Sequence, residues 1–270
     1  MTLTPEITTD RATVYRSTWQ ELAATLPDNM PGASLAIVDG PYNMRKADWD
    51  TFRDWNHFVA WYRPELEELT RVLDTSANVY LWGTDTSASA LRPLMAELGW
   101  RRRTRVIWDK VTPPLTLPLS SWPDVTEVCD HYQRGEPAFS QPAHNPRRAT
   151  GPHIPAVTCI WRLSPGAYVR ERLKGERGLA RDGSEVDLSL HPCQKPLAFY
   201  DRLIRSSSRP GDTVLEPYGG TLRAAVACHR LPPSEARHAI VCEPHGPYIE
   251  AVRPSLEWVP PTVDGLGLFG

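Results

Sequence analysis

Ser34-Leu35-Ala36-Ile37-Val38-Asp39-Gly40-Pro41-Tyr42-Asn43 is the stretch that decides the fold of this 270-residue chain. Its first five residues form a short, nearly all-apolar run, which predicts a β-strand covered on both faces, as in a parallel sheet. The strand then delivers a carboxylate, a flexible residue, a rigid proline and an aromatic ring to one edge of the sheet. Ligands bind at the carboxyl ends of strands in open α/β sheets, so these groups are expected to face a cleft. The alternative is an ordinary strand and turn in which Asp39 caps the next element.

Similar apolar runs that end in turn residues predict further strands at 78–82, 104–108, 213–215 and 238–242. Helical periodicity lies between them. Apolar residues recur every three or four positions in 48–73, where Pro64 predicts a kink or a new start, and again in 197–204 after Pro196. A third apolar helix is predicted at 222–228. Strands that alternate with helices predict an α/β fold with a doubly wound, mostly parallel sheet and helices on both faces.

The composition is ordinary for a globular protein and excludes several classes. Apolar residues make up 41% and charged residues 23%, and the 27 prolines are about twice the usual share. The longest apolar run is five residues, far below the ~20 of a membrane span, and the first residues show no signal-peptide pattern. The five cysteines form no C-x-x-C pair, which predicts reduced thiols in a cytoplasmic protein without a disulfide scaffold or a structural metal site.

Charge is unevenly distributed, although the net charge is only −2. Residues 1–98 carry 8 Lys and Arg against 14 Asp and Glu, whereas residues 99–190 carry 14 against 10. The range 111–190 is also rich in proline and shows no sustained hydrophobic period, which predicts an insert carried by the sheet. The positive middle of the chain, 99–190, is where a nucleic-acid contact is sought, although a solvated basic face is the commoner explanation.

A second informative segment runs from His191 to Arg223. It contains His-Pro-Cys-Gln-Lys-Pro, then a predicted helix, then a strand that ends in Glu216-Pro217-Tyr218-Gly219-Gly220. Two glycines between a strand and a helix let the backbone approach a ligand closely. Glu243 ends the following strand, where Rossmann-like folds place a carboxylate on the ribose of an adenosine cofactor. These features together predict a cofactor site.

Four of these segments resemble the motifs of one family, the DNA amino-methyltransferases. The segment 39–42 resembles their D-P-P-Y motif, 108–110 their W-D-K, 191–196 their H-P-x-Q-K-P, and 216–221 their D-P-F-x-G-S cofactor loop. The base-binding motif comes first and the cofactor motif last, as in the permuted β class of adenine-N6 and cytosine-N4 enzymes. The resemblance spans residues 12–255 and implies a circularly permuted, Rossmann-like methyltransferase fold.

The resemblance also implies roles for individual residues. In the catalytic set, Asp39 and the Gly40 carbonyl accept hydrogen bonds from the target amino group, Pro41 fixes the loop, and Tyr42 stacks on a base flipped out of the duplex. The implied cofactor is S-adenosylmethionine, and its site comprises Glu216, Pro217, Tyr218, Gly219, Gly220, Glu243, Gln194 and Lys195. Within that site Glu243 holds the ribose, the two glycines form the floor, and Glu216 lies near the methionine end. Gln194 and Lys195 either orient the loop before the helix or simply start that helix.

The implied reaction is methylation of the exocyclic N6 of a flipped adenine in double-stranded DNA. Serine at position 39 is more typical of cytosine-N4 enzymes, so Asp39 favours adenine, and cytosine-N4 methylation is the alternative. The implied organisation is a catalytic half with the base-binding loop at 1–110, a target-recognition insert at 111–190 and a cofactor-binding half at 191–270. A homodimer is the family expectation and no membrane partner is expected, while the restriction partner and the target sequence are left open.

Departures from the family pattern motivate a rival hypothesis. Gly40 replaces the first proline, Glu216 replaces the usual Asp, Leu222 and Arg223 stand for Gly and Thr, and 14–17 falls where the family usually shows Gly-Asp. These differences raise the alternative of a degenerate, non-catalytic nucleic-acid-binding subunit with the same fold. An RNA-directed enzyme is a third alternative. A Rossmann oxidoreductase is disfavoured, because no G-x-G-x-x-G lies near a first strand.

Overall fold

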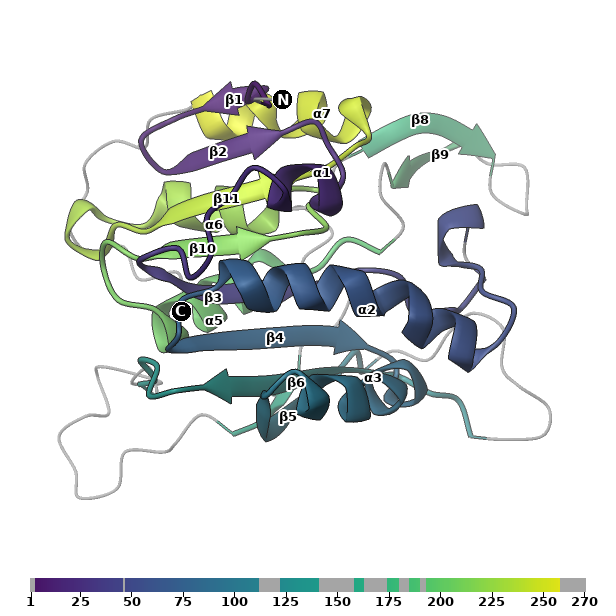
Figure 1. The fold of residues 1–270 in the computed structure, drawn as a ribbon. Helices are drawn as coiled ribbons and strands as arrows, with labels where there is room; N and C mark the ends of the chain where they lie inside the picture. The colour runs from purple at the N-terminus through teal and green to yellow at the C-terminus, as the bar shows by residue number, and fades with distance from the viewer. Residues whose placement is uncertain are drawn as a thin grey trace, which may run out of the picture.

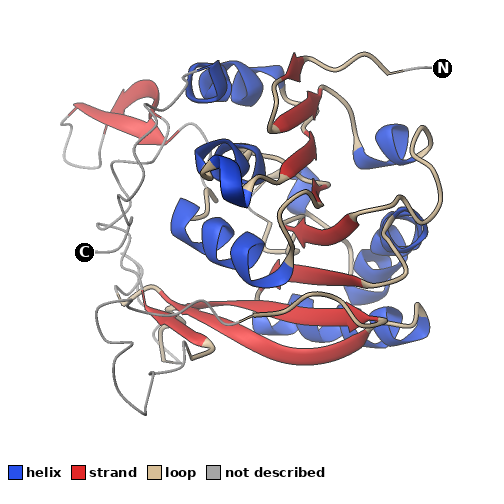
Figure 2. Cartoon of the chain, turned by 90° about the vertical axis from the view of Figure 1, so that its left-hand side faces the viewer, coloured by secondary structure: helices blue, strands red, loops and turns tan. Residues whose placement is uncertain are grey.

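A nine-stranded sheet with helices on both faces forms the centre of the molecule (Figures 1 and 2). The computed structural model describes residues 3–45, 47–111, 122–140, 158–162, 174–179, 185–189 and 193–257. In spatial order the strands are β1 (Ile7–Thr8), β2 (Ala12–Tyr15), β11 (His238–Cys242), β10 (Thr213–Glu216), β3 (Ala33–Val38), β4 (Ala77–Gly83), β6 (Thr126–Arg134), β5 (Arg101–Asp109) and β7 (Ile160–Arg162). A separate antiparallel pair is formed by β8 (Lys174–Leu179) and β9 (Glu185–Ser189).

The sheet is mostly parallel, which confirms the predicted fold class. The five strands from β2 through β11, β10 and β3 to β4 run parallel to their neighbours. Strand β6 is antiparallel to both β4 and β5, and β1 is antiparallel to β2. All seven residues of β4 are buried, which explains why its sequence, apart from Asn78, is almost entirely apolar.

Helices cover both faces of the sheet. One face carries α1 (Trp19–Ala23), α2 (Trp55–Val72) and α3 (Asp85–Glu97), and the other carries α5 (Leu197–Ser207), α6 (Arg223–Arg230) and α7 (Gly246–Glu257). Short 3₁₀ turns lie at Asp48–Asp50 and Pro233–Glu235. Helix α2 begins after Asp54, whose carboxylate accepts a hydrogen bond from the His57 amide at 2.7 Å, and it continues through Pro64 without a new start. No helix in the described ranges is long and apolar enough to cross a membrane.

The helices that connect the strands change from one face of the sheet to the other between two neighbouring strands, β3 and β10. The connection from β3 to β4 passes through α2 on one face, whereas the connection from β10 to β11 passes through α6 on the other face. Such a topological switch point opens a crevice at the carboxyl ends of the two strands. Asp39 follows β3 and Pro217 follows β10, so the fold brings the two motif loops to this crevice.

The sequence predicts an insert without strands in the range 111–190, but strand β6 lies within it. It pairs with β4 and β5 along its whole length and is therefore part of the central sheet. Its sequence, TEVCDHYQR, conceals this position because polar residues outnumber apolar ones in it. Asp130 is completely buried there and is neutralised by Arg92 at 3.0 Å and Arg105 at 2.7 Å. Much of the remainder of 111–190 lies outside the described residues.

Candidate active site

The loops that follow β3 and β10 touch each other at Gly40. A Cβ atom on Gly40 would lie 2.4 Å from the Tyr62 hydroxyl and 2.9 Å from Cε2 of Tyr218. The Tyr62 hydroxyl also donates a hydrogen bond to the Pro41 carbonyl at 2.9 Å. The residue that departs from the family's proline is therefore the one that lets a tyrosine from α2 and a tyrosine from the cofactor loop pack against the catalytic loop.

Four charged side chains of alternating sign lie beside this contact. The Lys195 ammonium is 3.0 Å from Oδ1 of Asp39 and 3.1 Å from Oε2 of Glu127. On its other side, Oε1 of Glu127 is 2.6 Å from the Lys110 ammonium. The arrangement joins three motifs that are far apart in the sequence, because Lys110 ends W-D-K, Lys195 belongs to the 191–196 motif and Asp39 opens the catalytic loop.

The buried position of Lys195 determines the electrostatics of this group. Burial alone lowers the pKa of Lys195, whose side chain is 1% exposed, but the carboxylates of Asp39 and Glu127 outweigh it and raise that pKa. Burial raises the pKa of Asp39, and Lys195 opposes this rise. Burial also acts to raise the pKa of Glu127, but Lys195 and Lys110 outweigh it and lower that pKa. Lys195 is thus a permanent cation that favours the ionised form of both acids.

Tyr42 contacts Asp39 directly. Its hydroxyl donates a hydrogen bond of 2.5 Å to Oδ1 of Asp39, and the Lys195 ammonium lies 5.2 Å from the centre of its ring. Only 9% of Tyr42 is exposed. Both donors to Asp39 reach Oδ1, and within the described residues no donor reaches Oδ2. Oδ2 is therefore the oxygen that an incoming N–H group would meet.

Asp50 holds the backbone of the catalytic loop. Its Oδ1 accepts hydrogen bonds from the amides of Tyr42 (2.6 Å) and Asn43 (2.8 Å), and its Oδ2 accepts one from Met44 (3.0 Å). Asn43 has a φ of 61°, so this turn bends through the left-handed region. Asp50 is only 2% exposed, and a buried carboxylate that accepts three amide hydrogen bonds fixes a loop firmly.

Gly219 and Gly220 hold the cofactor loop close to the next strand. A Cβ atom on Gly219 would lie 2.7 Å from Cγ1 of Val241, so no side chain fits there. Gly220 has a φ of 49°, and its amide donates a hydrogen bond to Oε2 of Glu243 at 2.7 Å. Oε1 of Glu243 accepts one from the His245 amide at 2.7 Å. Burial raises the pKa of Glu243, and these two amides oppose the rise.

Leu222 and Arg223 follow the two glycines without disturbing the loop. Leu222 adopts a φ of 52°, a left-handed conformation that glycine adopts at little cost. Its side chain is completely buried in the core between α6 and the sheet. Arg223 is 6% exposed, and its Nε donates a hydrogen bond to Thr221 Oγ1 at 3.1 Å.

Glu216 lies beneath the cofactor loop at the start of α6. It is 1% exposed, and its Oε2 accepts a hydrogen bond from the Ala224 amide at 3.0 Å. Burial raises its pKa well above the ordinary value. The hydrogen bond satisfies one of the free backbone amides in the first turn of α6. The expected place of Glu216 near the methionine end of a cofactor stays a prediction.

The remaining predicted site residues lie around these two loops. Gln194 is buried directly before Lys195. The Pro217 carbonyl accepts a hydrogen bond from the Cys242 thiol at 3.0 Å, and the Tyr218 ring packs against Trp61 and Tyr62. The first two residues of the 191–196 motif lie outside the described residues.

Three residues that organise the site were missed in the sequence, namely Glu127, Asp50 and Tyr62. Glu127 lies in a strand that was not foreseen, Asp50 reads as one of several acidic loop residues, and Tyr62 reads as part of an ordinary apolar helix stripe. The Trp-Asp-Lys motif is the one signal in the sequence that points toward Glu127, because its Lys110 pairs with that residue.

A family model described as DNA methylase, for N6 and N4 methyltransferases, matches residues 33–253. The chain belongs to this family. The match includes all the site residues described above, from Asp39 to Glu243.

Two curated relatives of this methylase are type II methyltransferases. M1.MboII of Moraxella bovis is 23% identical over 236 residues, which cover 80% of this chain and 85% of the relative. M.HinfI of Haemophilus influenzae is 23% identical over 279 residues, which cover 95% of this chain and 71% of the relative.

Solved structures share the fold of the methylase. The PvuII DNA methyltransferase, which is cytosine-N4-specific, matches with a TM-score of 0.68 at 15% identity over 96% of this chain and 90% of that one. The complex of M1.HpyAVI with S-adenosylmethionine matches with a TM-score of 0.59 at 17% identity over 90% of this chain and 98% of that one.

The family uses S-adenosylmethionine, and the residues of this methylase fit such a group. Each oxygen of Glu243 accepts one amide and retains a lone pair for a ribose hydroxyl. The Glu243 amide donates to the Tyr15 carbonyl at 3.0 Å, so the ends of β2 and β11 are adjacent. Ser17, two residues on, has a buried hydroxyl with no hydrogen-bond partner in the described ranges. Among all the residues that the structure describes, no cluster of His, Cys, Asp or Glu could hold a metal ion.

Proposed function

We propose that this chain is an adenine-N6 DNA methyltransferase, which transfers a methyl group from S-adenosylmethionine to a flipped adenine in double-stranded DNA. The observation that carries the proposal is the position of Asp39 at the switch-point crevice, paired with a buried lysine through one oxygen and open through the other. Asp at this position, rather than the serine that is more typical of cytosine-N4 enzymes, favours adenine.

The chemistry that the protein must supply is orientation. The lone pair of an exocyclic amine is delocalised into the ring, which makes the nitrogen a poor nucleophile. Oδ2 of Asp39 accepts an N–H of that amine and so localises the lone pair, while Lys195 favours the ionised form of Asp39 that this role needs. S-adenosylmethionine supplies an electrophilic methyl group when it is bound. Asp50 holds the loop amides rigid, because positioning within a few tenths of an ångström decides such reactions.

Two sets of side chains bind the reactants in this proposal. Tyr42 stacks on the flipped base on the side of its ring away from Lys195, which requires the loop to open, since the ring is now 9% exposed. Glu243 accepts the ribose hydroxyls, and Gly219 and Gly220 let the backbone approach the cofactor. The proline-rich insert 111–190 supplies phosphate contacts and base readout to the duplex.

Transfer of tritium from labelled S-adenosylmethionine to long duplex DNA, followed by nucleoside analysis, tests the proposal. Label is expected on N6-methyladenine. Asp39→Asn should lose activity at least a hundredfold, whereas Asp10→Asn, an exposed acid in the turn between β1 and β2, should not change it. Label found only on cytosine would overturn the adenine assignment in favour of the N4 alternative.

Calorimetric titration with S-adenosylmethionine separates the enzyme from a degenerate binding subunit. Stoichiometric binding that Glu243→Ala weakens is expected for the enzyme. A chain that binds DNA but takes up no cofactor would be the degenerate subunit instead.

A further inference from the structure

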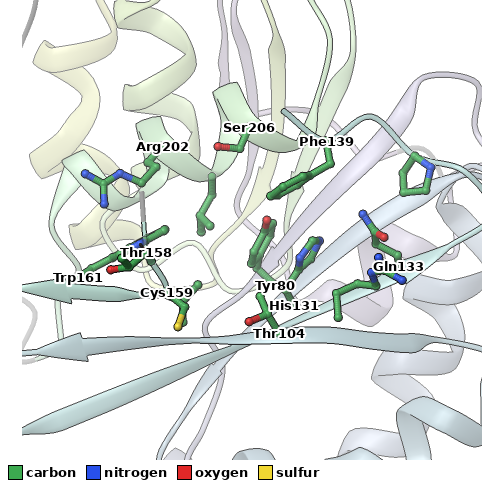
Figure 3. A pocket seen from close by; sticks show the side chains of 14 residues that line it. Tyr80, Thr104, His131, Gln133, Phe139, Thr158, Cys159, Trp161, Arg202 and Ser206 are labelled. Atoms are coloured by element: carbon green, nitrogen blue, oxygen red, sulfur yellow. Dashed lines mark hydrogen bonds between the residues drawn. The ribbon is translucent and has the colours of Figure 1, made fainter. Parts of the chain in front are cut away.

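A cavity of about 490 Å³ lies between α5 and the β4, β6, β5 and β7 end of the sheet (Figure 3). Residues of α5 form one wall, and strand residues with the segment after β6 form the others. Its volume is within the range of small-molecule sites, about 300–1,000 Å³. None of its lining residues is among those proposed to bind the target base or the methyl donor.

Stacked rings form one side of the cavity. Tyr80 and His131 are parallel within 8° at 4.4 Å between ring centres, and Phe139 continues the stack over His131 at 5.5 Å and 28°. Tyr80 and His131 are buried, but Phe139 is 51% exposed. The column thus ends in an aromatic face that the described chain leaves open, and a further planar ring can stack on such a face.

Hydrogen bonds hold His131 in a neutral form. The Asn78 amide nitrogen donates to the carbonyls of Ala138 and Ser207, both at 2.9 Å, so its oxygen must be the acceptor for His131 Nε2 at 2.9 Å. Nε2 of His131 therefore carries the proton and Nδ1 carries a lone pair. Burial and the nearby Arg103 lower the pKa of His131 to about 4, so this ring adds no charge near neutral pH.

Two guanidinium groups give the cavity a positive charge. Arg202 is half-buried, and its guanidinium lies 4.7 Å from the centre of the Trp161 ring. Arg103 lines the same cavity, and no described lining residue is acidic. Within the described residues neither arginine has a carboxylate at ion-pair distance. An arginine stacked on an aromatic ring keeps the N–H groups at its edge free, and these match the oxygens of a phosphate.

We propose that this cavity binds a nucleotide, with the base stacked on Phe139 and the phosphate held by Arg202, while Arg103 adds positive charge to the same cavity. Polar side chains in the lining, including those of Gln133 and Ser206, can meet the edge of a base. The nucleotide is either free or part of a single strand, and the two sources share this chemistry. The site goes beyond the proposed function, because it depends neither on the methyl donor nor on which base is methylated.

Calorimetric titration of the full chain with thymidine monophosphate tests the proposal, with thymidine and inorganic phosphate as separate arms. Saturating S-adenosylhomocysteine is present throughout, so that the cofactor site cannot take up the probe. Thymidine monophosphate is expected to bind at least tenfold more tightly than thymidine. Equal affinity of the two, or no binding of either, would overturn the proposal.

Two variants localise the site. Arg202→Met keeps a long side chain over Trp161 but removes the charge, and should abolish the advantage of the monophosphate. Phe139→Ala, at an exposed position, should weaken the nucleoside and the nucleotide alike by about tenfold. Arg230→Met, at an exposed arginine in the last turn of α6, should change nothing. Unchanged affinity in both Arg202→Met and Phe139→Ala would refute the assignment even if nucleotides bind.

An oligothymidylate of eight nucleotides distinguishes the two sources. Affinity at least tenfold above that of the mononucleotide, lost in Phe139→Ala, would identify a strand as the ligand, whereas equal affinity would identify a free nucleotide. These measurements need no methyl transfer, so failure of the proposed function would leave their outcome unaffected.

Discussion

Replacement of Lys195 by methionine tests the electrostatic core of the site. The variant keeps most of the length and the apolar stem of the side chain but removes the cation between Asp39 and Glu127, at 3.0 Å and 3.1 Å. At an effective dielectric constant near 20, each of these pairs is worth about 5 kcal/mol before desolvation is subtracted. Loss of one partner from a buried ion pair typically costs about 3–5 kcal/mol, and we expect that loss in the free energy of unfolding.

The same substitution should change the pH dependence of methyl transfer. Asp39 must be ionised to accept the substrate N–H, so activity is present above its pKa and is lost as the pH falls through it. Lys195 opposes the rise that burial imposes on this pKa, so its removal lets the pKa rise further. The acidic limb of the rate profile should therefore move to higher pH by at least one unit, which corresponds to about 1.4 kcal/mol.

A double-mutant cycle with Glu127→Gln gives the decisive comparison. Lys195→Met leaves two carboxylates facing each other, and Glu127→Gln removes one of them, so the double variant should lose about 1–3 kcal/mol less than the sum of the single variants. Lys110→Met is the matched control, because Lys110 pairs with Glu127 but is 31% exposed and therefore screened by solvent. Additive losses, together with an unmoved acidic limb in Lys195→Met, would refute the reasoning.

Three further predictions concern stability and are measured by denaturant unfolding. Gly40→Ala should cost about 1–3 kcal/mol because its Cβ would lie 2.4 Å from the Tyr62 hydroxyl, and addition of Tyr62→Phe should recover part of this loss; no recovery would contradict the packing argument. Leu222→Ala should cost about 2–5 kcal/mol in lost packing. Leu222→Gly should be no less stable than Leu222→Ala, since glycine also avoids the cost of about 1–2 kcal/mol that a side chain imposes on left-handed backbone. A Leu222→Gly variant less stable than Leu222→Ala would contradict this prediction. Burial raises the pKa of Glu65 to about 7, so the folded state binds its proton more tightly than the unfolded chain does. Stability should therefore fall as the pH rises from about 4.5 to about 7, and Glu65→Gln should reduce this slope; an unchanged slope in the variant would contradict the prediction.

The strands that build the crevice could be predicted because they are short apolar runs buried on both faces. β3, β4, β10 and β11 all follow that pattern. β6 could not be predicted from the same rule. Its polar residues are buried with partners from distant segments, such as the Asn78 amide for His131 and three arginines for Asp130. Polarity in the sequence indicates exposure only where no such partner exists.

The motif residues of the site could likewise be predicted, but not the contacts between them. Asp39 and Lys195 were both identified, yet their ion pair depends on the parallel order of β3 and β10 and on Glu127 in the unforeseen strand. In the sequence, the departures at Gly40 and Leu222 raise the alternative of a degenerate, non-catalytic chain. In the structure each has a local reason, since two tyrosines fill the space beside Gly40 and the Leu222 side chain turns into the core.

The energetic costs in this chain argue against a degenerate, non-catalytic subunit. Asn43 and Leu222 both hold left-handed backbone, and Asp39, Lys195 and Glu127 are charges taken largely out of water. Asp39, Asn43 and Leu222 follow the carboxyl ends of β3 and β10 at the switch point, and Lys195 and Glu127 join the same group through ion pairs. Strained backbone and buried charge destabilise a fold and are concentrated where a protein binds or reacts. A subunit that only presented a basic surface to nucleic acid would need none of them, because phosphate contacts require exposed cations rather than a buried, alternating group of acids and bases. The position of these costs therefore favours a working methyl-transfer site over a fold retained for binding alone.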